Sequence, residues 1–134
     1  MASTLKINTL TGVTTAGSIA VTGEGNSTTT NLQQGLCKAW TVCDMGDNAL
    51  DDSSNVSSLT DESTGRFYLT FTNSFSSVSH ADVAMFGSNG AHIAYSGNTD
   101  KTSSITGSLI CSNTSNSAVD GSPFINVTSH GDLA

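Results

Sequence analysis

The chain has 134 residues, 36% hydrophobic and 11% charged, which suffice for one domain with an appended arm but not for two ordinary domains. Four Lys and Arg against eleven Asp and Glu leave a net charge of -7, so the electrostatic attraction that nucleic acids and anionic membranes require is missing. No apolar run approaches the roughly 18 residues that cross a bilayer, and no signal peptide is evident. We therefore expect a soluble protein made in the cytoplasm, without membrane insertion or a nucleic-acid partner.

Residue composition favours β structure over helix. Ser and Thr supply 41 of the 134 residues and Gly another 13, whereas no segment has the length and apolar periodicity of an ordinary helix. We therefore expect an all-β fold, in which an extended N-terminal arm precedes a small antiparallel β-sandwich with a jelly-roll-like arrangement.

Residues 1–35 are predicted to form the arm. Its two alternating stretches, 5–10 and 18–22, carry only two or three large apolar side chains each, and the polar segments 11–17 and 23–30 follow them. Such segments bury too little apolar surface to offset a backbone ordering cost of about 1–2 kcal/mol per residue. Alone, the arm is expected to be disordered.

Residues 36–134 show the period-two alternation of β-strands. In the clearest strand, 66–72, Phe67, Leu69 and Phe71 share one face, as in an antiparallel sheet with one solvated face, and they are predicted core or interface residues. The segments 44–52 and 61–65 are predicted turns. The spacing of the strands is that of a β-sandwich or small barrel, and the strands are expected at 36–43, 55–60, 66–72, 81–86, 91–95, 104–111 and 124–128.

The expected strand 36–43 places Trp40 on the face opposite Cys37 and Cys43. Trp40 is predicted to be an anchor in the core or at a subunit interface. The two cysteines lie about 20 Å apart in an extended strand, which excludes a disulfide between them. Cys111 comes from another strand, and we expect all three cysteines to be buried free thiols without a zinc site.

Few residues combine in a pattern that supports chemistry. His80, His92 and His130 fall on separate expected elements, away from any nucleophile motif, and surface or edge positions are expected for them. The acidic segment 44–52 could bind calcium through its carboxylates, but it lacks the ordered spacing and terminal glutamate of a calcium loop. A solvated acidic loop is the favoured interpretation, and neither a metal nor a cofactor is expected.

Enzymatic activity is not expected either. Paired carboxylates that cleave polysaccharides need a cleft lined by aromatic side chains, and the chain has one Trp and two Tyr. A depolymerase would require carboxylates that meet between chains. Asp51, Asp52 and Asp61 are the cluster to consider for it.

Several sequence blocks resemble a module of the tail-fibre-like proteins of marine bacteriophages, especially those that infect cyanobacteria and SAR11-type bacteria. Residues 35–40 read GLCKAW, 52–61 read DSSNVSSLTD and 64–72 read TGRFYLTFT. The opening blocks STLKINTL and GSIAVTGEG are similar to the N-terminal arm of these proteins. Cys37 and Cys43 stand where the family usually has Ala and an aromatic residue, and Glu-Ser-Thr-Gly replaces the commoner Asn-Gly-Thr-Gly turn, so detailed contacts do not transfer.

The resemblance implies a location in the virion, homotrimeric assembly and contacts with other virion proteins. Physical chemistry agrees, because three arms wound together would bury apolar groups that one arm leaves exposed. The predicted trimerisation and attachment residues are Leu5, Ile7, Leu10, Ile19 and Val21. The sandwich would present its loops 87–90, 97–101 and 113–122 to a host receptor. The candidate receptor contacts are Ser88, Asn89, Asn98, Asp100 and Asn116.

Two structural roles fit an arm joined to a small β domain. The leading hypothesis is a non-enzymatic short tail fibre or fibre-like adhesin that attaches by its arm and contributes to host adsorption. The alternative is a capsid decoration or head-fibre protein whose arm lies in a groove of the shell and stabilises it.

Overall fold

The computed structural model describes residues 4–12, 19–22, 28–86, 93–96, 100–113, 115–120 and 124–134. The chain divides between Leu36 and Cys37 into two units. We call residues 1–36 the N-terminal unit and residues 37–134 the C-terminal unit, and each is described by itself.

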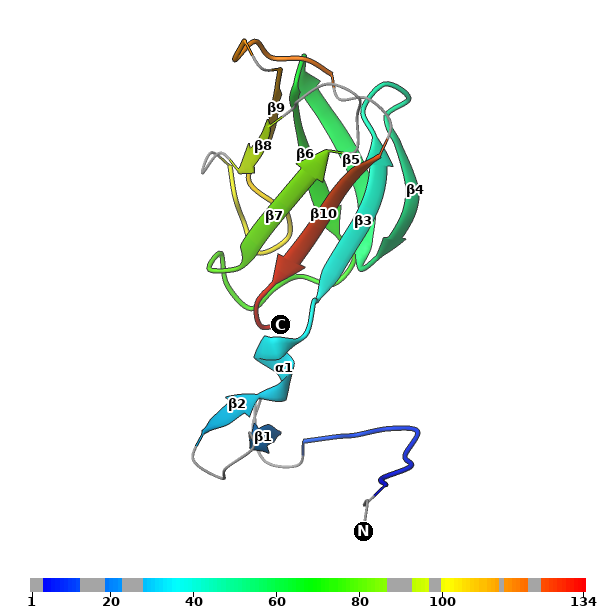
Figure 1. Cartoon of the computed structure of the whole chain (residues 1–134), viewed down its shortest axis with the longest axis vertical. Coiled ribbons are helices and arrows are strands. Elements are labelled where there is room, and N and C mark those ends of the chain that lie inside the picture. The colour runs from blue at the N-terminus through cyan, green and yellow to red at the C-terminus, as the bar shows by residue number, and fades with distance from the viewer. Residues whose placement is uncertain are drawn as a thin grey trace. The chain divides into compact units, whose positions relative to one another are not determined.

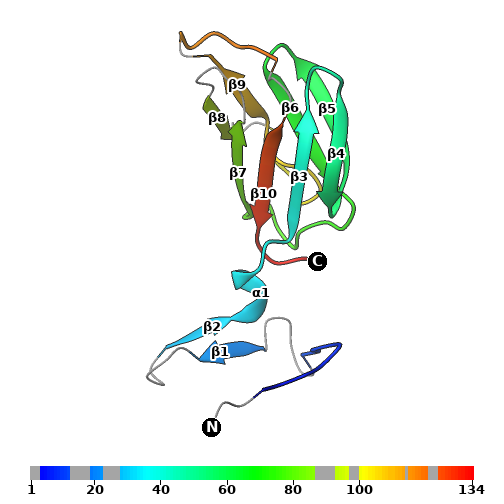
Figure 2. The same ribbon diagram turned by 45° about the vertical axis from the view of Figure 1, so that its right-hand side comes forward.

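The N-terminal unit contains a two-stranded antiparallel ribbon, β1 (Ala20–Thr22) and β2 (Thr29–Asn31), followed by the one-turn helix α1 (Leu32–Gly35). Val21 lies opposite Thr30, and the Leu32 N–H donates to the Ile19 carbonyl at 2.8 Å. Figure 2 shows the two strands side by side. Thr29 and Thr30 were expected in an unordered polar segment, but β-branched residues pair readily across a ribbon.

The C-terminal unit is a small antiparallel β-sandwich of two four-stranded sheets, with strand orders β4-β3-β10-β7 and β5-β6-β9-β8 (Figure 1). In the first sheet β3 and β4 are neighbours. In the second sheet β5 lies beside β6, and β8 lies beside β9. The strands are β3 (Ala39–Asp44), β4 (Ala49–Ser54), β5 (Val56–Ser63), β6 (Arg66–Phe71), β7 (Ala81–Phe86), β8 (Ile93–Ser96), β9 (Leu109–Ser112) and β10 (Ile125–His130).

The core lies between the two sheets because each strand turns alternate side chains inward. Phe67 and Leu69 of β6 are buried, as are Ile125 and Val127 of β10 in the opposite sheet. Full burial of such side chains contributes about 1.5–3 kcal/mol each. The alternation that predicts the strand 66–72 is therefore confirmed, and it places Phe67, Leu69 and Phe71 in the core.

The acidic segment 44–52 differs most from its predicted form. It was predicted to be a turn, but residues 49–54 form β4, which pairs with β3 at the sheet edge. The register shifts between Val42 and Cys43, so that Asp52 pairs with Val42 whereas Leu50 pairs with Cys43. The bulge interrupts the alternation, and no residue of this edge strand is buried, so no periodic apolar pattern marked it.

Two other predicted strands are shorter than expected. Residues 36–38 precede β3, and of the expected strand 104–111 only residues from Leu109 onward belong to β9. Residues 104–106 still run beside β6, because the Phe71 N–H donates to the Ser104 carbonyl at 2.8 Å and the Thr106 N–H to the Leu69 carbonyl at 3.0 Å. Of the expected strand 91–95, residues 91 and 92 lie outside the described residues.

Candidate functional site

The apolar side chains of the N-terminal unit are exposed. Leu5 is 78% exposed, Ile7 50%, Leu10 54% and Val21 50%, and Ile19 is half-buried. None of the described side chains of this unit is buried. The N-terminal unit therefore buries no apolar cluster among its described residues, whereas the C-terminal unit has a complete one.

Trp40 is not a core residue. Its side chain is 38% exposed on β3, between the buried Ala39 and Thr41, so it points away from the opposite sheet. The prediction of a core position is therefore wrong, and a role at a subunit interface stays a prediction. Because side chains alternate along β3 and Cys43 points into the core, Trp40 must face outward.

His80 was expected at the surface or at a sheet edge; it directly precedes the edge strand β7, but its side chain is 0% exposed. Its ring stacks on Phe75, with centroids 4.6 Å apart, and meets the edge of Phe71 at 5.4 Å. Its Nδ1 lies 3.0 Å from Asp82 Oδ1, and its Nε2 lies 2.9 Å from the Thr102 carbonyl. The burial was not predicted because it depends on how the Phe71 and Phe75 rings and the Thr102 carbonyl, which is 22 residues away, pack around the side chain.

A buried ion cluster surrounds Asp82. Its Oδ1 accepts a hydrogen bond from Ser129 Oγ at 2.6 Å, and its Oδ2 lies 3.0 Å from Lys101 Nζ. Lys101 Nζ also donates to the His80 carbonyl. The two ring nitrogens of His80 thus face the Asp82 carboxylate and the Thr102 carbonyl. The Asp82 carboxylate thus joins His80, Lys101 and Ser129.

The cluster does not form a catalytic relay. Ser129 donates to Asp82 rather than to the histidine, and the Thr102 carbonyl occupies the ring nitrogen that a general base would use. The cluster instead joins β7, β10 and the segment 101–102, so its role is to hold these elements together. His130 is half-buried at the end of β10, and His92 lies outside the described residues.

The candidate depolymerase carboxylates do not gather. Asp51 and Asp52 are exposed on β4, whereas Asp61 is exposed on β5 in the other sheet. Among the described residues, no group of three His, Cys, Asp or Glu side chains could hold a metal ion. In the acidic segment, Asp44 Oδ1 accepts the Gly46 N–H at 2.7 Å and so closes the turn between β3 and β4.

The three cysteines are free, as expected, but only two are buried. Cys37 is exposed because it precedes β3 rather than belonging to it. Burial raises the pKa of Cys43 to about 12, with smaller contributions from Asp51 and Asp44, and it raises the pKa of Cys111 to about 12, with smaller contributions from Cys43 and Asp120. These thiols therefore stay protonated at neutral pH, and Cys111 contacts Met45 Sδ at 3.6 Å.

The predicted receptor loops are described only in part. Ser88, Asn89 and Asn98 lie outside the described residues. Asp100 and Asn116 are exposed and adopt left-handed backbone conformations, with φ of 64° and 60°. Such residues occupy tight turns, which hold exposed polar side chains in defined positions.

Comparison with protein-family models, with curated proteins and with solved structures finds no match. Among the described residues, no helix combines the length and hydropathy of a membrane span. The function proposed below therefore rests on the exposed apolar side chains of the N-terminal unit and on the sequence blocks named above.

Proposed function

We propose that the chain is a homotrimeric structural protein of a bacteriophage virion, a short tail fibre or fibre-like adhesin. Residues 1–35 attach it to other virion proteins and trimerise it, and the β-sandwich contributes to host adsorption. Its action is binding, not catalysis.

One contrast within the chain carries this proposal. In the N-terminal unit, Leu5, Ile7, Leu10 and Val21 are each at least half exposed, whereas the C-terminal unit buries a continuous core. Each apolar side chain that passes from water into an interface contributes about 1.5–3 kcal/mol. An arm that cannot satisfy its own apolar groups gains most by packing against other copies or against the particle.

The resembling blocks support the same proposal. GLCKAW leads into β3, DSSNVSSLTD spans the end of β4 and most of β5, and TGRFYLTFT covers the turn and all of β6. The blocks thus occupy three neighbouring segments of the sandwich. Short strands that display polar loops on a rigid core are a common platform for surface recognition.

Antibody labelling tests the proposal on particles of the phage that encodes the chain. Fab fragments against residues 37–134 are expected to label the tail and to reduce adsorption to host cells. Fab fragments against residues 4–12 serve as the matched control and are expected to leave intact particles unlabelled, because the arm is packed in the assembly. Label over the shell without an effect on adsorption would support the decoration role instead, and absence of label would contradict both roles.

A further inference from the structure

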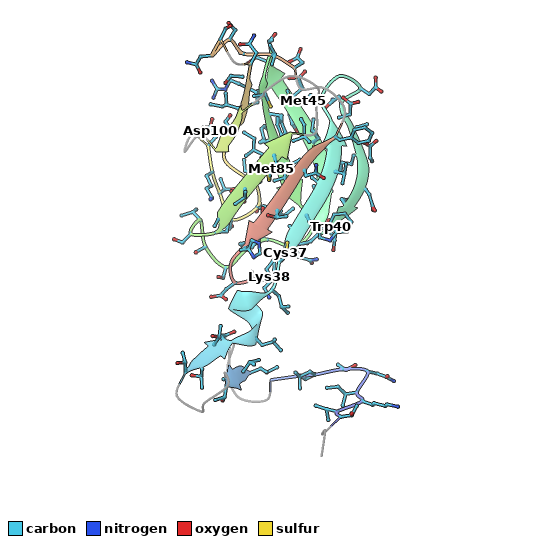
Figure 3. The ribbon with its side chains drawn as sticks, in the orientation of Figure 1. Cys37, Lys38, Trp40, Met45, Met85 and Asp100 are labelled. Atoms are coloured by element: carbon cyan, nitrogen blue, oxygen red, sulfur yellow. The ribbon has the colours of Figure 1, made fainter. Side chains whose placement is uncertain are left out.

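The outward face of the sheet β4-β3-β10-β7 carries an apolar patch. Val83 and Met85 of β7 are 56% and 67% exposed, and Trp40 of β3 is 38% exposed. Figure 3 labels Trp40 and Met85 on this sheet. Large apolar groups gathered on one sheet face mark an interaction surface more often than scattered single residues do.

The strand register arranges these side chains in two rows across the sheet. In the first row Trp40 and Val83 lie on either side of Thr128, and in the second Val42 and Met85 lie on either side of Asn126. Each row therefore contains two apolar side chains, on the same two strands. The two rows are equivalent in apolar content, and on β4 the first row continues to Ser54 and the second to Asp52, both exposed.

Opposite charges stand at the two ends of β3. Lys38 precedes the strand, where its N–H donates to the Ser129 carbonyl at 2.9 Å, and so it lies at the edge of the face that carries Trp40 and Val42. Asp44 ends the strand on the same face, about 20 Å from Lys38 along an extended chain. Neither takes part in an ion pair among the described residues, where the ion pairs are those of Asp82.

We propose that this face is a two-fold contact with a second copy of the chain. The two-fold axis lies in the plane of the contact, perpendicular to the strands and at the level of Thr41. It therefore places β3 of one copy over β3 of the other, running in the opposite direction, and β7 over β7 in the same way. The same operation places the Trp40 row against the Val42 row of the other copy, and Lys38 of each copy against Asp44 of the other. The face is thus complementary to itself in apolar content and in the charges at the two ends of β3.

The size of the face predicts a weak contact. Six-residue strands spaced as in any sheet give a face of roughly 20 Å by 20 Å, at the low end of specific interfaces. A two-fold contact cannot close within a three-fold trimer, so it joins sandwiches of different trimers. It does not depend on the arm, and it goes beyond the proposed function.

Charge exchange tests the contact in the full-length chain. In either variant, Lys38→Asp or Asp44→Lys, like charges face each other at both ends of the contact. Each substitution is expected to weaken self-association about tenfold, measured by sedimentation as the increase in mass with concentration. When the two variants are mixed, a contact between one copy of each again sets an aspartate against a lysine at both of its ends. The mixture is therefore expected to restore the association, and recovery on mixing cannot arise from an effect within one chain.

Asp47→Lys is the matched control, since it makes the same charge change as Asp44→Lys at an exposed residue of the turn that follows β3. Thermal unfolding checks that all variants are folded. The proposal is overturned if the wild-type mass never exceeds that of the arm-mediated assembly, if the single variants associate like the wild type, or if mixing restores nothing. If only the arm-mediated assembly is absent, the proposed function is contradicted. The two-fold contact is then still tested by whether mixing the two variants restores association.

Discussion

At the scale of the residue, Asp82 holds the most consequential position in the sandwich. Its side chain is 0% exposed and lies within 3.0 Å of both His80 and Lys101, while Ser129 donates to the same carboxylate. Removal of one partner from a buried ion cluster leaves charge without compensation, which costs far more than the loss of an exposed ion pair.

Asp82→Asn is therefore expected to lower the free energy of unfolding by about 3–5 kcal/mol. Urea denaturation measures the change, and Asp100→Asn, at an exposed position close to Lys101, is the control that should leave stability within about 0.5 kcal/mol of the wild type. An equal denaturation midpoint for Asp82→Asn and the wild type would show that the cluster is not energetically coupled to the fold.

At the scale of the element, the turn between β5 and β6 depends on Gly65. Its φ of 71° is left-handed, and a Cβ there would meet the Cys111 carbonyl oxygen at 2.6 Å and the Val119 nitrogen at 2.8 Å. These backbone atoms cannot move cheaply, because Cys111 N–H donates to the Gly65 carbonyl at 2.7 Å. The glycine thus allows β6 and β9 to approach.

Gly65→Ala is expected to destabilise the chain by at least about 1–3 kcal/mol, the scale of a strained backbone position. Gly35→Ala is the matched control, since its added methyl group meets nothing within 4 Å. Thermal unfolding of both variants measures the difference. Equal midpoints for the two substitutions would contradict the close approach at Gly65.

At the scale of the whole molecule, the sequence predicted those elements in which one face is buried. In β6 the alternation of Phe67, Leu69 and Phe71 with polar groups is uninterrupted, so the sandwich and part of its core could be predicted. The strand β4 was missed because a bulge and two exposed aspartates remove its period. The burial of His80 was missed because Lys101 and Thr102, its distant partners, give no local signal.

The two candidate interfaces also differ in how far the sequence alone predicts them. The exposed apolar residues of the arm could be chosen from composition alone, since too few large groups accompany them to form a core. The outward apolar face required strand register, because Trp40, Val83 and Met85 come together only when β10 lies between β3 and β7. Sequence alone therefore assigned Trp40 to either the core or an interface.

Assembly through the arm is tested by the solution mass of the full-length chain and of a variant with Leu5, Ile7 and Leu10 replaced by Ser, measured by light scattering after size exclusion. We predict a trimer for the wild type and a monomer for the variant, at a concentration too low for the weak two-fold contact. Val78→Ser, which removes a 56% exposed side chain from the C-terminal unit, should leave the trimer intact. A monomeric wild type, or a triple variant that stays trimeric, would contradict assembly through the apolar arm.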